Sequence, residues 1–303
     1  MSALRWSAAL ALDLAVGEPP ASAHPVVFLG RAISALDRLG PRDAAGQRAF
    51  GIALVGIPAV LAALAGAATG LISSRILRGL ASVWLLKSAF AMRELLLSGD
   101  RVEQALRRGD VAAARERLTA LVSRDTSELR PDEAASAAIE SLAENLADSF
   151  IAPLLFYRIG GLPAALAYRA VNTADAMVGY HGKYERIGKA AARLDDALNY
   201  VPARISAFAL IAAAALTGQG DARGALDVAL RDHRRTASPN AGWPMAAAAG
   251  ALGVRLAKRD HYSLGDGRRP PGPDDIRRAR GLVIAASLLA TVVVLATYRR
   301  GMR

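Results

Sequence analysis

Three groups of polar side chains interrupt otherwise apolar, alanine-rich sequence between residues 140 and 202. Glu140, Glu144 and Asp148 have the spacing i, i+4, i+8, which places them on one face of a helix, with Asn145 beside them. Carboxylates without neighbouring histidine or cysteine suit a hard cation such as magnesium, and magnesium usually arrives with phosphate. The acidic stripe (Glu140, Glu144 and Asp148) is therefore predicted to be a metal–phosphate centre on a helix.

Two more polar groups follow the acidic stripe along the chain. Asn172 and Asp175 are spaced i, i+3 and so share a helix face. The last group forms a polar turn that Pro202 is expected to close: Arg193, Asp195, Asp196 and Asn199.

A structural explanation of these acids stays open. An acid–arginine network could hold helices together, for example Asp195 or Asp196 with Arg193 or Arg204. For the acidic stripe, the next basic residue along the chain is Arg158. Because three adjacent carboxylates repel one another without a compensating cation, this distance favours a metal.

Several strings make the sequence similar to one known family. Inside the polar block they are ENLADSFIAPL, NTADAMVGY and RLDDALNYVPAR; outside it they are DLAVGEPPASAHPVVFLGR, LVSRDTSEL and SPNAGWPMAAAAGAL. In this order they resemble the CobD/CbiB family, the adenosylcobinamide-phosphate synthases of cobalamin biosynthesis. The resemblance covers the chain from about Asp13 to about Leu252.

The resemblance implies an integral membrane ligase. Such an enzyme would join the carboxylate of adenosylcobyric acid to (R)-1-aminopropan-2-ol O-phosphate, or a close relative, using ATP and Mg²⁺. A carboxylate is a poor acyl donor, so ATP would convert it to an acyl phosphate that the amine can attack. Magnesium would neutralise the triphosphate, and a base would take the amine proton.

Roles for individual residues follow from the resemblance. The expected catalytic residues are Glu140, Glu144, Asp148, Asp175 and Asp196. The expected magnesium ligands are Glu140, Glu144, Asp148 and Asp195. The expected substrate-binding residues are His24, Arg124, Asp125, Asn145, Asn172, Lys183, Arg193, Asn199 and Asn240.

Local explanations remain for some of these positions. His24 precedes Pro25 and could simply begin a helix, while Asp125 or Thr126 could cap a turn. Glu18 stands where the family usually has aspartate. Residues 1–30 also have features of a secretory signal, but cleavage after Ala23 would remove Asp13 from the family motif, so we expect the segment to be retained.

Composition narrows the class of protein. The 303 residues are 53% hydrophobic and only 5% aromatic, with no cysteine, which excludes disulfides, thiolate metal sites and cysteine nucleophiles. The net charge of +11 comes from scattered basic residues without aromatic interleaving, so we expect contact with lipid or phosphate and no nucleic acid. No nucleotide-binding glycine loop, nucleophile elbow or HExxH motif is present.

The expected fold is all-α: a multi-pass helical protein of the cell membrane, treated as one domain over residues 1–303. Residues 50–72 carry no charge and would span about 34 Å as a helix. Residues 205–217 and 282–298 are the other predicted membrane segments. Residues 149–170 are broken by glycine and proline and are expected to be broken or re-entrant.

The segment from residue 76 to 121 is amphipathic, with a break at Gly109–Asp110. It is predicted to be a soluble or interfacial helical hairpin whose charges, including Lys87, form a solvated face. Pro131 is expected to begin the helix that carries the acidic stripe.

The predicted topology contains a conflict. The arginines after residue 298 favour a cytoplasmic C-terminus, and the catalytic block, about residues 124–204, would share that side. Three crossings would then place the basic segment 219–281 outside, unless residues 205–217 are re-entrant or another crossing exists.

Two other functional classes remain open. A non-catalytic membrane sensor of the AmpE type would share the helical frame without needing clustered acids. A transporter would require more complete spans and internal repeats, and no repeat is found. The expected partners are the corrinoid, the amino alcohol phosphate, ATP and lipid, together with other membrane-bound cobalamin-assembly enzymes.

Overall fold

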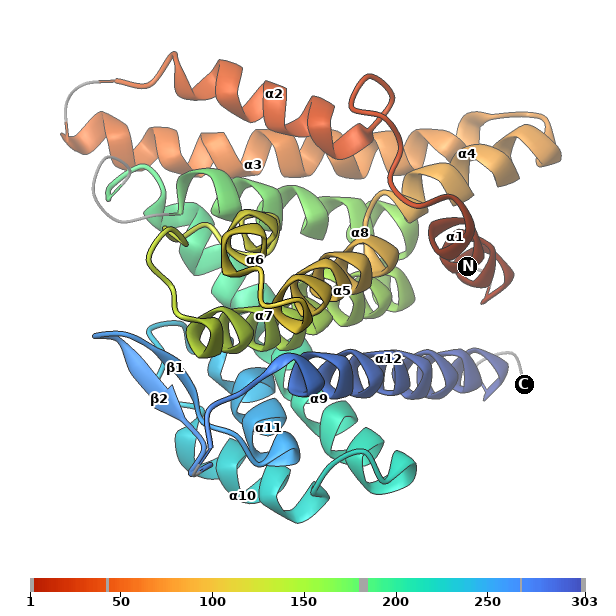
Figure 1. Cartoon of the computed structure of the whole chain (residues 1–303). Coiled ribbons are helices and arrows are strands. Elements are labelled where there is room, and N and C mark those ends of the chain that lie inside the picture. Colours follow the sequence, from red (N-terminus) through yellow and green to blue (C-terminus); the bar gives the residue numbers. More distant parts are fainter. Residues whose placement is uncertain (1–2, 42–43, 180–184, 268, 301–303) are drawn as a thin grey trace. The chain divides into compact units, whose positions relative to one another are not determined.

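The computed structural model describes residues 3–41, 44–179, 185–267 and 269–300. These residues are almost entirely helical, which confirms the expected all-α class (Figure 1). The chain divides into two compact units, and each takes segments from separate parts of the sequence. Unit 1 comprises residues 1–91, 152–199 and 297–303, and unit 2 comprises residues 92–151 and 200–296.

Unit 1 is built from the N-terminal helices and one long helix from the middle of the chain. Its elements are α1 (Ala3–Val16), α2 (Pro25–Asp37), α3 (Ala44–Ala68), the short 3₁₀ helix η1 (Thr69–Leu71), α4 (Arg75–Lys87), α8 (Ala152–Val178) and the first part of α9 (Lys189–Thr217). Helices α3 and α8 approach closely because of a small residue. A Cβ atom on Gly66 would lie only 2.9 Å from Cα of Pro163, so a larger residue could not occupy this crossing.

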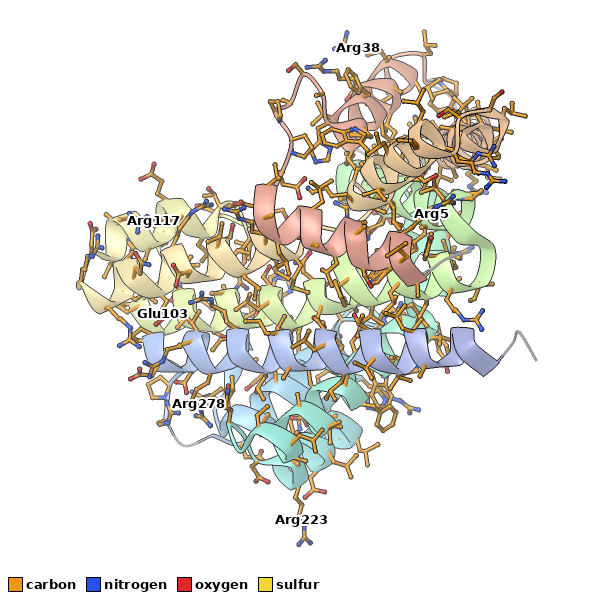
Figure 2. The ribbon with its side chains drawn as sticks, turned by 90° about the vertical axis from the view of Figure 1, so that its right-hand side faces the viewer. Arg5, Arg38, Glu103, Arg117, Arg223 and Arg278 are labelled. Atoms are coloured by element: carbon orange, nitrogen blue, oxygen red, sulfur yellow. The ribbon has the colours of Figure 1, made fainter. Side chains whose placement is uncertain are left out.

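Unit 2 contains the amphipathic helices and the C-terminal part of the chain. Its elements are α5 (Met92–Arg107), α6 (Val111–Leu118), α7 (Pro131–Leu146), the π-helical turn η2 (Ala147–Ile151), the remainder of α9, α10 (Ala222–Asp232), α11 (Gly242–Leu252), strands β1 (Leu256–Lys258) and β2 (Tyr262–Leu264), and α12 (Pro273–Arg300) up to residue 296. The antiparallel hairpin of β1 and β2 was not predicted from the sequence. Figure 2 shows Arg223 on α10 projecting into solvent, in keeping with a basic surface.

Four of the described stretches are long and apolar enough to cross a membrane: Gly46–Leu71, Pro131–Val178, Lys189–Thr217 and Pro273–Ala296. This composition identifies a multi-pass membrane protein. The predicted segments 50–72 and 282–298 lie in the first and last of these. Residues 205–217 are the end of a 29-residue helix, so that span is longer than predicted.

The break expected in residues 149–170 is confirmed. The π-helical turn η2 precedes α8, and within α8 Gly161 has φ 70° and ψ −158°, outside the helical region. Glycine tolerates this conformation because it has no Cβ. By contrast, the prediction that Pro202 closes the polar turn is wrong, since Pro202 lies inside α9 and the helix continues to Thr217. Proline removes one backbone hydrogen bond, and a long helix can tolerate that loss.

The helix break at Gly109–Asp110 is confirmed, but residues 76–121 form three helices in two units rather than one hairpin, and one of their charges was misjudged. Helices α5 and α6 meet at Gly109, which has φ 73°, and Asp110 caps α6. Lys87, at the end of α4, is only 1% exposed and is not part of a solvated face. Its ammonium lies in unit 1 between two carboxylates from the N-terminal segment, which the helical periodicity of α4 could not reveal.

Candidate functional site

Helix α7 presents the first part of the acidic stripe. Pro131 occupies the first turn, and Glu133 accepts a hydrogen bond from the Arg130 backbone N–H at 2.9 Å, which fixes the start of the helix as predicted. Glu140 and Glu144 follow one helical turn apart. Glu140 is buried, and Glu144 is half-buried.

A polar cavity of about 170 Å³ in unit 2 contains both glutamates (Figure 1 shows α7 and the hairpin that form it). Its walls come from α7, from the segment after α6 and from the β1–β2 hairpin. The lining residues are Leu121, Val122, Ser123, Arg124, Ala137, Glu140, Ser141, Glu144, Lys258 and Tyr262. We call this the α7 cavity. It brings two cationic and two acidic side chains together, so it can bind a ligand that carries charges of both signs.

Glu140 is held by three donors. Its Oε1 accepts from the Ser136 hydroxyl at 2.7 Å, and its Oε2 accepts from the Tyr262 hydroxyl at 2.9 Å. Arg124 also reaches Oε2, at 3.4 Å. The sequence argument that the acidic stripe has no basic partner is therefore wrong: the nearest arginine along the chain is not the nearest in space.

Tyr262 remains protonated in this position. Burial raises the pKa of its phenol, and the Glu140 carboxylate raises that pKa further. Tyr262 can therefore serve as a permanent donor to Glu140. A second link joins the hairpin to the helix, because the Ser136 hydroxyl also accepts from the backbone N–H of Ala257 at 2.9 Å.

The third acid of the stripe lies outside the α7 cavity. Asp148 is half-buried in η2, where the π-helical turn interrupts the 3.6-residue periodicity on which its predicted alignment depended. Asn145 is engaged by residues one turn away in α7 and η2. Its Nδ2 donates to Ser141, and its Oδ1 accepts from the Ser149 hydroxyl at 3.0 Å.

A second polar cluster lies in unit 1, where α8 meets the start of α9. Asp195 is buried, and its two oxygens accept from Asn172 Nδ2 at 3.2 Å and from Asn199 Nδ2 at 2.9 Å. The Tyr168 hydroxyl donates to Asn199, and Arg169 donates to Asn172. The structure thus unites residues from the second and third polar groups of the sequence.

A third charged cluster connects α1, the turn after it and the end of α4 in unit 1. Lys87 Nζ lies 2.8 Å from Glu18 and 3.3 Å from the fully buried Asp13. Glu18 also contacts His24 Nε2, while His24 Nδ1 accepts from the Val26 backbone N–H. His24 therefore begins α2 as its N-cap, which agrees with the local explanation for this residue.

The remaining predicted residues have varied surroundings. Asp125 is exposed and accepts from the Ser127 backbone N–H at 2.9 Å, and this bond lowers the pKa of its carboxyl. Arg193 is exposed on α9, and Asp175 and Asp196 are half-buried. Asn240 is buried and accepts from Arg204, whose guanidinium also covers the Tyr200 ring. Lys183 lies outside the described residues.

Sequence reasoning missed Lys258, Tyr262, Lys87 and Arg169. Lys258 and Tyr262 belong to a short hairpin in a basic segment without a recognisable motif. Lys87 and Arg169 occur at ordinary helical spacing. Only the long-range contacts distinguish these residues from surface charges.

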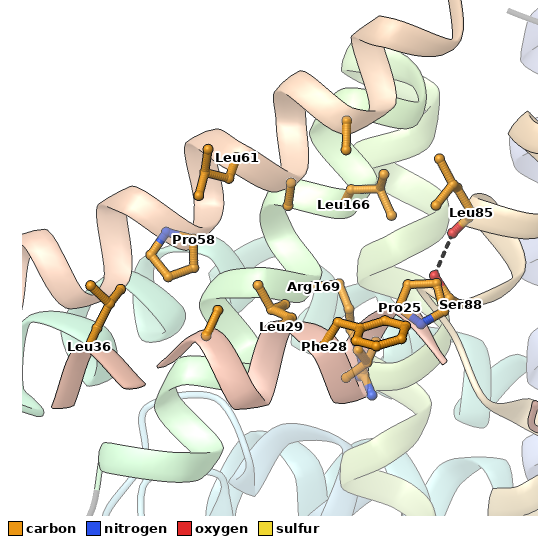
Figure 3. A pocket seen from close by; sticks show the side chains of 14 residues that line it. Pro25, Phe28, Leu29, Leu36, Pro58, Leu61, Leu85, Ser88, Leu166 and Arg169 are labelled. Carbon is orange, nitrogen blue, oxygen red and sulfur yellow. Dashed lines mark hydrogen bonds between the residues drawn. The ribbon is translucent and has the colours of Figure 1, made fainter. Parts of the chain in front are cut away.

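A further cavity in unit 1, of about 270 Å³, has a different character (Figure 3). Its walls are apolar side chains of α2, α3, α4 and α8, including Leu29, Leu61 and Leu166, with Arg169 near Phe28 at one end. Such a lining suits an apolar group and does not suit phosphate chemistry.

The described carboxylates could supply a magnesium ion with only part of its ligands. No three His, Cys, Asp or Glu residues converge on a metal position within the part of the chain that the structure describes. Magnesium often takes one or two protein carboxylates and completes its shell with substrate phosphates and water. Asp195 fits this pattern well, because two amide groups orient its carboxylate as outer partners commonly do for metal ligands.

Comparison with known proteins covers nearly the whole chain. The family model described as "CobD/Cbib protein" matches residues 6–286. The chain is 44% identical over 276 residues to cobalamin biosynthesis protein CobD of Dehalococcoides mccartyi, with 88% of each chain covered. It is 41% identical to the protein of the same name from Klebsiella pneumoniae, covering 96% of this chain and 95% of the relative.

A relative that carries the name CbiB matches over a similar share of the chain. Cobalamin biosynthesis protein CbiB of Salmonella typhimurium is 39% identical over 314 residues, covering 98% of this chain and 97% of the relative. No solved structure matches the chain.

Proposed function

Because this chain belongs to the CobD/CbiB family and has a role in cobalamin biosynthesis, we propose that it is an adenosylcobinamide-phosphate synthase. The reaction joins the carboxylate of adenosylcobyric acid to the amine of (R)-1-aminopropan-2-ol O-phosphate or a close relative. ATP supplies the driving force. The single observation that carries this proposal is the α7 cavity, where Arg124 and Lys258 meet Glu140 and Glu144.

The proposed chemistry has two steps. The carboxylate attacks the γ-phosphorus of ATP, which gives an acyl phosphate and ADP. The amine nitrogen, after losing a proton to a base, attacks the acyl carbon. The bond from that carbon to the phosphate oxygen breaks, and inorganic phosphate leaves with the second proton that the nitrogen loses. Bound magnesium would neutralise the triphosphate charge.

We assign separate tasks to the two polar clusters. Glu144 in the α7 cavity is the proposed base. Glu140, which contacts Ser136, Tyr262 and Arg124, is the proposed positioning residue. Asp195 is the preferred magnesium ligand in unit 1, with Asp148 in unit 2 as the alternative. Asp175 and Asp196 remain further candidates for acid–base work.

Amide and basic groups would hold the substrates. Asn172 and Asn199 orient Asp195, and the buried Asn240 lies two residues before the start of α11. Arg124 is the described arginine best placed to bind phosphate. His24, Asp125, Asn145, Lys183 and Arg193 keep their substrate roles only as expectations from the family resemblance.

Two contacts of the α7 cavity support a membrane topology in which the cavity faces the cytoplasm. Arg124 precedes the stretches Pro131–Val178 and Lys189–Thr217, and Tyr262 follows them, yet both contact Glu140. One crossing by each stretch would return the chain to the same side, whereas the predicted three-span topology would separate these residues. Segments 72–130 and 218–272 contain eleven and nine Lys or Arg residues, and by the positive-inside rule this charge supports the proposal that both face the cytoplasm.

The test is turnover by the full chain in lipid nanodiscs. Adenosylcobyric acid, the amino alcohol phosphate, ATP and magnesium are supplied, and the amide product and ADP are measured together by mass spectrometry. We expect equal amounts of amide and ADP. Absence of both products, with folded protein, would favour the AmpE-like sensor.

A further inference from the structure

We propose that the α7 cavity binds the phosphate-bearing amine substrate itself, with Lys258 and Arg124 on the phosphate and Glu144 on the ammonium. This assignment rests on the proposed function and adds to it the place where one substrate binds. It gives a substrate role to Lys258 and a positioning role to Tyr262. ATP would bind elsewhere.

The charges of the α7 cavity favour a zwitterion. A triphosphate entering it would meet the carboxylates of Glu140 and Glu144 as well as the two cations. A small molecule with a phosphate at one end and an ammonium at the other can satisfy both signs at once. Such charge-assisted hydrogen bonds are stronger than neutral ones.

Arg124 retains capacity to bind an anion. Its guanidinium contacts Glu140 at 3.4 Å, but its Nε is buried and has no hydrogen-bond partner among the described residues. A buried N–H without an acceptor is costly. A phosphate oxygen would supply the missing acceptor and bring a charge of the correct sign.

The size of the α7 cavity also favours a small ligand. Its volume is about 170 Å³. A protein cavity of about 150 Å³ holds benzene, so a space of this size can hold a small ligand. An amino alcohol phosphate with a three-carbon chain is a ligand of this size.

The hairpin places Lys258 through its strand pairing. Lys258 and Tyr262 are directly opposite each other in the antiparallel register of β1 and β2. Tyr262 is fixed to Glu140, and the neighbouring Ala257 N–H is fixed to Ser136. These two anchors on α7 position the backbone that carries Lys258 at the cavity wall.

The arrangement also provides the proton transfer that the reaction needs. The substrate enters as an ammonium, which has no lone pair. Transfer of one proton from nitrogen to the Glu144 carboxylate leaves a neutral amine. The nitrogen lone pair can then attack the activated acyl carbon. The bond from that carbon to the phosphate oxygen breaks, and the departing phosphate accepts the second proton that the nitrogen loses as the amide forms.

The test measures binding directly, without ATP or the corrinoid. Calorimetry of the full chain in nanodiscs compares 1-aminopropan-2-ol O-phosphate with two probes that each lack one charge, 1-aminopropan-2-ol and isopropyl phosphate. We expect each probe to bind about tenfold or more weakly than the zwitterion. Lys258→Met should weaken binding of isopropyl phosphate, and Glu144→Gln should weaken binding of the amino alcohol.

Arg259→Gln is the matched control, because Arg259 lies next to Lys258 on the same hairpin but is exposed and pairs with Glu133. It should leave the affinity for the zwitterion unchanged. Unchanged affinity in both Lys258→Met and Glu144→Gln would overturn the assignment, as would displacement of the zwitterion by magnesium–ATP. Amide turnover by the wild-type chain in the same nanodiscs would then show that the ligase function stands and only the location is wrong.

Discussion

The hydroxyl of Tyr262 donates a 2.9 Å hydrogen bond to Oε2 of Glu140, although the two residues are 122 positions apart in the chain. This contact joins the β1–β2 hairpin to the helix that carries the acidic stripe. It also requires both segments to lie on the same side of any membrane that the intervening helices cross.

Tyr262→Phe tests the positioning role. The change keeps the ring and removes the donor, so Glu140 loses one partner at a cost of about 1 kcal/mol in unfolding free energy. We expect the KM for the amine substrate to rise several-fold while the KM for ATP is unchanged, as steady-state kinetics would measure. Tyr200→Phe, on an exposed ring of unit 2, is the control. Equal effects on both KM values would contradict a role specific to the amine.

Asp195→Asn tests the magnesium assignment. The substitution removes the negative charge and places an amide where Asn172 and Asn199 both donate. We expect the magnesium concentration for half-maximal turnover to rise about tenfold or more. Changes to metal ligands, or to the residues that orient them, commonly weaken metal affinity by this amount. Asp227→Asn, exposed on α10, should have no effect. If Asp148→Asn raises this magnesium concentration more than Asp195→Asn does, the metal ligand is Asp148 in the acidic stripe and not Asp195.

Lys87→Met tests the buried charge cluster of unit 1. Removing the ammonium leaves the Asp13 carboxylate buried beside Glu18 without its cation. Breaking a buried pair costs about 3 kcal/mol or more, so the thermal unfolding midpoint in detergent should fall clearly. Arg75→Met, at the exposed start of α4, serves as the control. Adding Asp13→Asn to Lys87→Met should recover part of the loss, and a further loss would mean that repulsion between the acids is unimportant.

Asp232→Asn tests a pH-dependent contribution to stability in unit 2. Asp232 is buried and accepts from Arg231 at 2.8 Å through both oxygens and from the Gly265 backbone N–H. The bond from Arg231, the largest influence, lowers the pKa of this carboxyl. The ionised Asp232 carboxylate therefore contributes fully to the free energy of unfolding above its pKa in the unfolded chain, about 3.9. This contribution is lost as pH falls through the lower pKa of the folded protein.

The measurement is the unfolding midpoint of wild type and Asp232→Asn between pH 3 and pH 7. We expect the variant to be less stable by about 2 kcal/mol near pH 7, with the difference shrinking below about pH 4. A difference that stays constant over this range would show that ionisation of Asp232 is not its source.

Membrane topology can be tested with reporter fusions and carbonate washing. The protein should stay in the membrane fraction after carbonate treatment, since alkaline carbonate releases proteins held by charge but does not extract apolar spans from the bilayer. Fusions within segment 218–272 should report the cytoplasm. With four crossings, a fusion after Arg300 should lie on the side opposite to segment 218–272 and therefore outside, although the terminal arginines favour the cytoplasm. Reporter signals from the two fusions on the same side would refute four single crossings.

The sequence by itself determined the helical class, the membrane character and the family. Long uncharged runs and helical spacing act locally, so they could be read without tertiary contacts; the start of α7 at Pro131 and the break near Gly161 are examples. The acids Glu140, Glu144 and Asp195 were found for the same reason, because isolated charges in apolar sequence are conspicuous.

Only the tertiary structure decided which of these residues lie together. Arg124 and Tyr262 reach Glu140 from distant segments, and Asp195 meets Asn172 across two helices. The π-helical turn at η2 separated Asp148 from a stripe defined by regular periodicity. Periodicity predicts which side chains share a face of one helix, but packing between elements decides what faces them, and that is why Lys87 and Lys258 could not be recognised from sequence.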